Sequence, residues 1–325
     1  MRIVMMGTGT FAEPTFELLL AQRPDEVVGL FTQPDRVAGA ERGSTRQTGK
    51  GMKSIAQEKG VPVFQPDSIN TPEGLDQLRS LRPDLLVVAA YGQILSGDVL
   101  AVPGHGGINV HASLLPKYRG AAPIAWAIYH GETQTGVTII RMSVGLDAGD
   151  MLAQESTAIG PEETTGDVEA RLAQVGARLA SDMVARFARG EVPTGGKQDR
   201  QQVTKAPKLK KEDGSVDWTR NAGQVCCQVR AMHPWPTPYT YLHRAGQPAV
   251  RLILHRAQPL EARDESAVLG AVVPMGADRL VVNAGDHTLL EILELQPAGK
   301  KRMPASAFLR GYRLNPGDRL GPEAP

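Results

Sequence analysis

Residues 108–123 read INVHASLLPKYRGAAP, and this stretch decides the fold of the first half of the chain. A short apolar run is followed by a loop with Pro and Gly, and a helical pattern then begins at 123. The same alternation surrounds it, with apolar runs at 3–6, 27–31, 85–90 and 137–140 and helical patterns at 14–21, 52–59 and 72–81. Strands that alternate with helices predict an α/β domain built on a doubly wound, mostly parallel sheet.

The stretch also carries an amide and an imidazole on one side of the predicted strand. Side chains alternate across a strand, so Asn109 and His111 project to the same face. Asp147 lies in the turn VGLDAGD at 144–150, from which its carboxylate could reach a histidine elsewhere on the sheet. Together the three groups suit acyl transfer, because the amide can donate to an oxyanion, the imidazole can move protons and the carboxylate can orient and charge the imidazole.

Taken singly, each of these residues has a structural explanation. Asn109 could end a strand, His111 could be a hydrogen-bonded core residue, and Asp147 could cap its turn. Their common face and their position near strand ends, where parallel sheets bind ligands, favour the catalytic interpretation.

Three motifs resemble the formyltransferase family that uses 10-formyltetrahydrofolate. They are NVH at 109–111, SLLP at 113–116 and GLDAGD at 145–150, and the likeness extends from GTGTFA at 7–12 to QPAGKK at 296–301. The resemblance implies a Rossmann-like catalytic domain followed by a small C-terminal β-barrel of the oligonucleotide-binding (OB) type. Within the family, it points to members that formylate the α-amine of methionine on initiator methionyl-tRNA for translation initiation.

The resemblance also implies the roles of individual residues. Asn109, His111 and Asp147 would be catalytic, and 10-formyltetrahydrofolate would be the co-substrate that donates the formyl group. Contacts to the folate would come from the four residues Ser113, Leu114, Leu115 and Pro116.

Binding of tRNA must come from local basic clusters, because the net charge of the chain is only +1. The resemblance implies that a basic, glycine-rich loop at 34–53 contacts the tRNA, and within it we single out Arg36 and Arg42. Further basic residues gather at 197–211 and 300–313.

Length and composition indicate two globular domains. The chain has 325 residues, of which 41% are hydrophobic and 22% charged. We expect a catalytic domain at 1–189, a polar, glycine-containing linker at 190–206, and the barrel, with β-rich runs at 239–243, 249–255, 280–283 and 288–295, at 207–325.

The cysteines and the apolar segments predict a cytoplasmic protein. The only cysteines, Cys226 and Cys227, are adjacent, which suits neither a disulfide nor a zinc site. The apolar run at the N-terminus is too short for a secretory signal, and no segment reaches the roughly 18 apolar residues of a membrane span. We therefore expect a monomer with no metal and no membrane partner.

Three other functions are compatible with parts of this pattern. A folate-dependent enzyme that formylates a small amine would share the site but would lack a second domain. An RNA-binding module on an inactive α/β scaffold would have no need to keep Asn109, His111 and Asp147 together. A dinucleotide oxidoreductase is disfavoured because the glycine-rich loop at 7–12 has Ala12 where its third glycine would stand.

Overall fold

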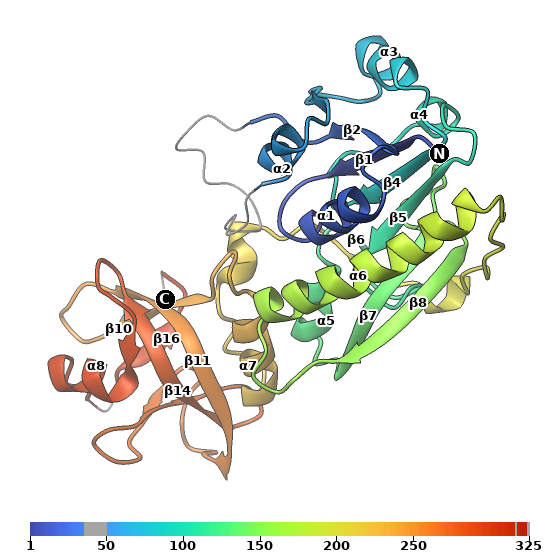
Figure 1. Ribbon diagram of the computed structural model, residues 1–325. Coiled ribbons are helices and arrows are strands. Elements are labelled where there is room, and N and C mark those ends of the chain that lie inside the picture. The colour runs from blue at the N-terminus through green and yellow to red at the C-terminus, as the bar shows by residue number, and fades with distance from the viewer. Residues whose placement is uncertain (36–50, 316, 324–325) are drawn as a thin grey trace. The chain divides into compact units, whose positions relative to one another are not determined.

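The computed structural model describes residues 1–35, 51–315 and 317–323. They form two compact units (Figure 1). Unit 1 comprises Met1–Ile124, Gln134–Ile159 and Asp167–Lys208, and unit 2 comprises Ala125–Thr133, Gly160–Gly166 and Leu209–Pro325. The predicted linker at 190–206 thus lies within unit 1. The division into domains at 1–189 and 207–325 stays a prediction.

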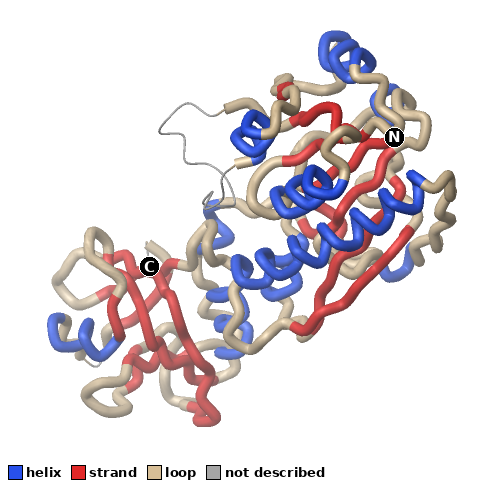
Figure 2. Tube along the Cα trace, viewed as in Figure 1, coloured by secondary structure: helices blue, strands red, loops and turns tan. Residues whose placement is uncertain are grey.

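Seven strands of unit 1 form one mixed sheet in the order β3-β2-β1-β4-β5-β7-β8 (Figures 1 and 2). The strands from β3 to β5 run parallel, and β7 and β8 run antiparallel to their neighbours. Their bounds are β1 (Ile3–Gly7), β2 (Val27–Phe31), β3 (Val63–Phe64), β4 (Leu85–Ala89), β5 (Gly107–His111), β7 (Gln134–Arg141) and β8 (Met151–Ala158). The predicted fold class, with its doubly wound and mostly parallel sheet, is confirmed.

Helices cover both faces of this sheet, so every residue of β1 and β4 is buried. On one face, Val4 and Val88 share a core cluster with Leu78 and Val99. On the other face, a Cβ atom at Gly176 would come within 2.6 Å of Val110. The helix at Thr165–Ala188, which contains Gly176, therefore lies close against β5. The helices of unit 1 are α1 (Glu13–Gln22), α2 (Met52–Glu58), α3 (Pro72–Ser80), α4 (Gly97–Leu100) and α6 (Thr165–Ala188), whereas α5 (Pro123–Tyr129) lies mostly in unit 2.

Unit 1 also contains a two-stranded ribbon that the sequence analysis does not predict. Strand β6 (Arg119–Gly120) pairs in parallel with β9 (Lys205–Ala206), just after the 3-10 helix η1 (Arg200–Gln202). Gly120 has φ +127°, and a Cβ atom there would collide with the carbonyl oxygen of Ala206. The ribbon therefore requires glycine at 120.

Unit 2 is built around an antiparallel sheet in the order β12-β13-β14-β11-β10-β16, with β15 (Met303–Pro304) paired to β14. A bridge from Ala271 to Arg319 joins its two edges and closes it into a barrel, as predicted. The strands are β10 (Tyr239–His243), β11 (Val250–Arg263), β12 (Val272–Val273), β13 (Leu280–Asn283), β14 (Thr288–Pro297) and β16 (Arg319–Gly321). The 3-10 helix η2 (Lys211–Gly214) and the helices α7 (Ala222–Ala231) and α8 (Ala305–Gly311) complete the unit.

A buried tryptophan is hydrogen-bonded to a threonine of β10, which in turn is hydrogen-bonded to β16. The indole Nε1–H of Trp218 donates to Thr240 Oγ1 at 3.0 Å, and this hydroxyl donates to the carbonyl oxygen of Gly321, also at 3.0 Å. Both side chains are buried, so the polar groups are satisfied inside the core. Within the described ranges, no helix has the length and apolar content to cross a membrane.

Candidate functional site

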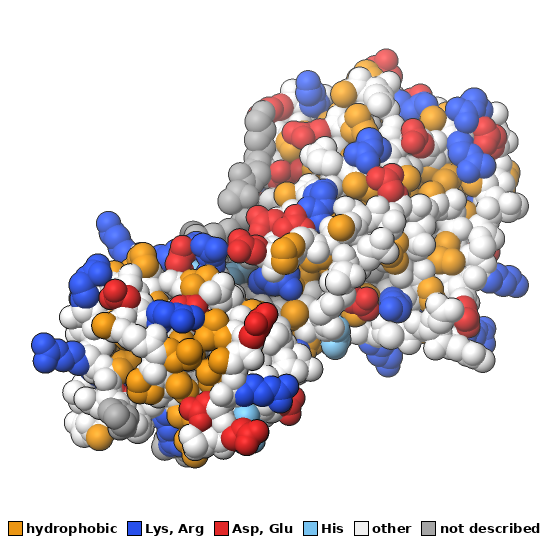
Figure 3. All heavy atoms as spheres, turned by 90° about the horizontal axis from the view of Figure 1, so that it is seen from below, with side chains coloured by type: hydrophobic (Ala, Val, Ile, Leu, Met, Phe, Trp, Pro, Cys, Tyr) orange, Lys and Arg blue, Asp and Glu red, His pale blue; other side chains and the backbone are white. Residues whose placement is uncertain are grey.

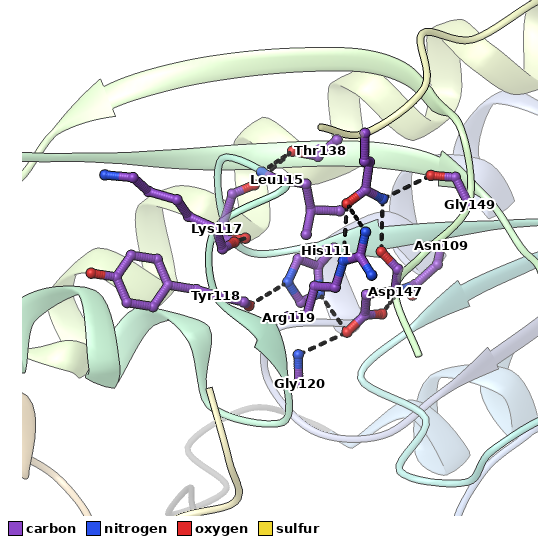
Figure 4. Close-up of polar contacts among 12 residues, drawn as sticks. Asn109, His111, Leu115, Lys117, Tyr118, Arg119, Gly120, Thr138, Asp147 and Gly149 are labelled. Atoms are coloured by element: carbon purple, nitrogen blue, oxygen red, sulfur yellow. Dashed lines mark hydrogen bonds and ion pairs between the residues drawn. The ribbon is translucent and has the colours of Figure 1, made fainter. Parts of the chain in front are cut away.

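Asn109, His111 and Asp147 meet at the carboxyl end of β5 (Figure 4). Asn109 Nδ2 donates to Asp147 Oδ1 at 3.3 Å, and His111 Nδ1 lies 3.6 Å from Asp147 Oδ2. Val110, between the first two residues, faces the opposite side of the sheet, toward Gly176. The structure thus brings together the three side chains that the sequence singles out.

The orientation of His111 follows from a backbone contact. Its Nε2 atom lies 2.9 Å from the carbonyl oxygen of Tyr118, which can only accept a hydrogen bond. Nε2 therefore carries a hydrogen, and Nδ1 is the ring nitrogen that faces Asp147. His111 is buried, whereas Asn109 and Asp147 are half-buried. A ligand would therefore reach the amide and the carboxylate first, with the imidazole behind them.

Asp147 is held in a strained turn by backbone groups. Its φ is +46°, a left-handed conformation that non-glycine residues adopt rarely. The backbone N–H of Gly120 donates to Asp147 Oδ2 at 2.9 Å. Two residues later, a Cβ atom at Gly149 would collide with the carbonyl oxygen of Arg141, so glycine is required there. These constraints aim the carboxylate at His111.

Two polar residues that the sequence analysis did not single out complete this arrangement. Gln198 Nε2 donates to the carbonyl oxygens of Asp147 at 2.7 Å and Gly149 at 2.8 Å. Arg119 donates to Gln198 Oε1 from Nε at 3.0 Å and from Nη2 at 2.7 Å. Gln198 lies in a stretch whose glycines and charges are typical of a linker. No local sequence pattern indicates that its side chain contacts the Asp147 turn.

The predicted folate loop at 113–116 forms a closed network of hydrogen bonds. Thr138 Oγ1 donates to the carbonyl oxygen of Ser113 at 2.6 Å and accepts from Leu115 N at 3.1 Å and from Gln154 Nε2 at 2.8 Å. Ser113 and Leu115 are buried, whereas Leu114 and Pro116 are half-buried. The loop has a defined shape, and its contact with folate stays a prediction.

Exposed apolar side chains lie on two loops that follow strands of this sheet. Ile94, in the loop after β4, is 72% exposed, and Val144 and Leu146, in the Asp147 turn, are 70% and 62% exposed. A Cβ atom at Gly97 would lie 3.8 Å from Val144, so the turn lies beside the segment that follows Ile94. By contrast, Tyr91 belongs to the core, and burial raises its pKa to about 12. We call Ile94, Val144 and Leu146 the apolar rim.

The predicted tRNA contacts Arg36 and Arg42 lie outside the described residues. Unit 2 has a surface hollow of about 450 Å³ with aromatic and basic walls. Within it, the Arg251 guanidinium lies 4.2 Å from the centre of the Tyr239 ring. Its lining residues are Lys211, Trp235, Pro236, Tyr239, Tyr241 and Arg251. In the part of the chain that the structure describes, no group of three or more His, Cys, Asp or Glu side chains could hold a metal ion.

Comparisons with known proteins identify the family of this chain. The formyl transferase family matches residues 1–184, and the C-terminal domain of formyl transferases matches residues 208–313. The chain belongs to the formyltransferase family. Two relatives that match it over nearly their full length are methionyl-tRNA formyltransferases. That of Citrifermentans bemidjiense is 46% identical over 99% of this chain and 96% of its own length, and that of Moorella thermoacetica is 44% identical over 99% of each chain.

Solved structures share the fold of this formyltransferase. A sugar 3N-formyl transferase, determined in the presence of dTDP and 5-N-formyl-THF, has a TM-score of 0.66 over 93% of this chain and 99% of its own, at 14% identity. The N-formyltransferase of Helicobacter canadensis, in complex with folinic acid and dTDP-3-aminofucose, has a TM-score of 0.64 over 90% of this chain and 98% of its own, also at 14% identity. At 14% identity, these two structures show only that the fold is shared.

Proposed function

We propose that this protein transfers the formyl group of 10-formyltetrahydrofolate to the α-amine of methionine on initiator methionyl-tRNA, for translation initiation. Relatives that are methionyl-tRNA formyltransferases align with it over 99% of its length. The observation that carries the chemistry is the convergence of Asn109, His111 and Asp147 on one another at the carboxyl end of β5.

In this reaction, the amine nitrogen attacks the formyl carbon, and the carbonyl oxygen becomes an oxyanion. The Asn109 amide carries two N–H groups, one of which contacts Asp147, so the other is left for the oxyanion. His111, when doubly protonated, would add a second donor through Nδ1. Stabilisation of the developing charge by donors already in position is commonly the largest single contribution to such a rate.

The reaction also moves a proton from the attacking amine to the departing nitrogen of the folate. A carboxylate accepts a proton from the amine, and the adjacent imidazole can pass one to the leaving group. The 3.6 Å separation between His111 Nδ1 and Asp147 Oδ2 places these two groups next to each other. The new carbon–nitrogen bond forms first and gives the oxyanion, and the bond to the folate nitrogen breaks when the oxyanion collapses and that nitrogen takes up the proton.

The apolar rim offers a surface that suits a flat heteroaromatic formyl donor. Sites for such ligands combine apolar walls with a few fixed polar groups. Ile94, Val144 and Leu146 supply exposed apolar surface, the first in the loop after β4 and the other two in the Asp147 turn. We propose that Ser113, Leu114, Leu115 and Pro116 complete the folate site, with the half-buried Leu114 and Pro116 as the accessible members.

The acceptor requires a surface for RNA. Positive and negative side chains are mixed over the face in Figure 3, so local clusters must supply the affinity. The hollow in unit 2 combines aromatic rings with Lys211 and Arg251, as proteins that bind unpaired nucleotides do. We propose it as one tRNA contact, with Arg36 and Arg42 as others. Affinity should then fall steeply with added salt.

Three further proposals extend the sequence analysis. The protein acts as a monomer, it works in the cytoplasm, and it consists of domains at 1–189 and 207–325 with a linker at 190–206. Sedimentation and limited proteolysis would test the first and third proposals.

The decisive experiment measures formylated product from 10-formyltetrahydrofolate with three acceptors. They are initiator methionyl-tRNA, elongator methionyl-tRNA and a dTDP-linked amino sugar. We expect product with the first, and a loss of about 10²–10⁴-fold in rate for His111→Ala. The control His105→Ala, at an exposed histidine of unit 1, should be unaffected. Formylation of the sugar alone would overturn the proposed acceptor, and equal rates for His111→Ala and wild type would overturn the site.

A further inference from the structure

The side chain of Gln198, which is not part of the Asp147 turn, is hydrogen-bonded to the backbone of that turn. Its single amide group donates to the carbonyl oxygens on either side of Ala148, at 2.7 and 2.8 Å. The remainder of the turn offers little support, because residues 143–146 and 148 are exposed. A strained φ of +46° at Asp147 persists only where surrounding contacts maintain it. Gln198 supplies two such contacts.

Arg119 holds Gln198 in turn, and its two neighbours in sequence touch the candidate catalytic pair. The carbonyl oxygen of Tyr118 accepts from His111, and the backbone N–H of Gly120 donates to Asp147. The three-residue segment 118–120 therefore contacts the imidazole and the carboxylate through its backbone (Figure 4). The Arg119 side chain reaches the turn through Gln198.

The pairing of β6 with β9 ties this segment to the chain that follows Gln198. Thr204 Oγ1 accepts from Tyr118 N at 2.8 Å, and the carbonyl oxygen of Thr204 accepts from Arg119 N at 2.9 Å. The ribbon and the Arg119–Gln198 contact thus join residues 118–120 and 198–206 at both ends. We call this pair of segments the clamp.

We propose that Gln198 and Arg119 are positioning residues that set the separation of the Asp147 carboxylate from His111. The inference rests on the proposed function, in which these two groups act together on one proton. Without the clamp, the turn would relax and the carboxylate would move, whereas the substrate-binding surfaces would remain. A displacement of about 1 Å at a reacting group can cost roughly a hundredfold in rate.

The test uses Gln198→Glu, which can still accept from Arg119 but cannot donate to the Asp147 turn. We expect kcat to fall about ten- to a hundredfold, with KM for both substrates and the thermal midpoint nearly unchanged. Gln57→Glu is the matched control, because this glutamine is exposed and lies on α2, outside the clamp. Wild-type kcat in Gln198→Glu, or a fall that matches a loss of folded protein, would overturn the proposal.

A second readout does not depend on activity. The NMR chemical shifts of the His111 ring, recorded in the full chain, should change in Gln198→Glu and not in Gln57→Glu, because the carboxylate beside the ring has moved. If the wild-type protein makes no formylated tRNA but this change is seen, the proposed function fails and the positioning role stands. Unchanged chemical shifts of the ring would overturn the positioning role whatever the activity.

Discussion

Tyr118 and Gly120 lie two residues apart, and each contacts one member of the pair formed by His111 and Asp147. The carbonyl oxygen of Tyr118 lies 2.9 Å from His111 Nε2, and the N–H of Gly120 lies 2.9 Å from Asp147 Oδ2. The imidazole and the carboxylate are therefore oriented by neighbouring points of the segment 118–120, which ends in β6. Because this one segment carries both contacts, a shift of it would disturb both groups at once.

Asn109→Ala should lower kcat for formyl transfer by about 10²–10³-fold, the usual effect of losing one oxyanion donor. Asn109→Asp should be equally impaired, because it keeps the shape of the side chain but lacks the N–H donors. Single-turnover kinetics would measure both. Asn315→Ala, at an exposed asparagine of unit 2, is the control. Normal turnover by Asn109→Asp would show that no donor is needed at this position.

Gly120→Ala should reduce stability by about 1–3 kcal/mol, because an alanine at φ +127° is strained and its Cβ atom would collide with Ala206. It should also lower kcat, since the Gly120 N–H contacts Asp147. Calorimetry and kinetics would measure the two effects. Gly104→Ala serves as the control, because a Cβ atom there meets nothing within 4 Å. If both variants behave alike, close packing of the ribbon at Gly120 is not important.

Trp235→Ala and Arg251→Ala should raise KM for charged tRNA and leave kcat unchanged. Loss of one stacked base costs about 1–3 kcal/mol, which corresponds to roughly 5- to 150-fold in affinity. Arg251→Ala should also make tRNA binding less salt-dependent. Titrations at several salt concentrations would test this, with Arg263→Ala at the far end of β11 as the control. Unchanged KM in both hollow variants would remove the hollow from the tRNA path.

Unit 2 should lose stability as the pH falls below about 6.5. His233 and His255 stack with ring centroids 5.1 Å apart, and burial lowers the pKa of each below the usual 6.5. Arg302 also lowers both pKa values, whereas hydrogen bonds and Glu294 oppose the shift. The unfolded chain therefore takes up protons at a higher pH than the folded chain does. This stability is present above 6.5 and is lost as the pH falls through the folded pKa values.

Tryptophan fluorescence would follow this loss, because Trp126, Trp218 and Trp235 all belong to unit 2. Denaturation at pH 7.5 and pH 5.5 should show a smaller difference for His255→Phe, which keeps a ring but cannot be protonated. His105→Phe in unit 1 should behave like the wild type. A wild-type protein that is equally stable at both pH values would contradict the prediction.

The elements that the sequence predicts are those with a local hydrophobic pattern. The apolar runs at β1, β2 and β4 are buried strands, and the helical pattern at 72–81 is helix α3. Strand β8 is absent from the predicted set because it is an edge strand, half-buried on one face and exposed on the other, with Gln154 and Glu155 in its middle. Strands β6 and β9 have two residues each, which is too few for any period.

By itself, the sequence determined the strands and helices of the doubly wound sheet, the strands of the barrel and the common face of Asn109 and His111, because each depends on a period within a few residues. Only the tertiary structure decided that Asp147 contacts both side chains, and that Gln198 and Arg119 support it. Those contacts join segments far apart in the chain, and their geometry depends on how backbone carbonyls and N–H groups pair after folding. The residue types alone do not show which of these groups will pair.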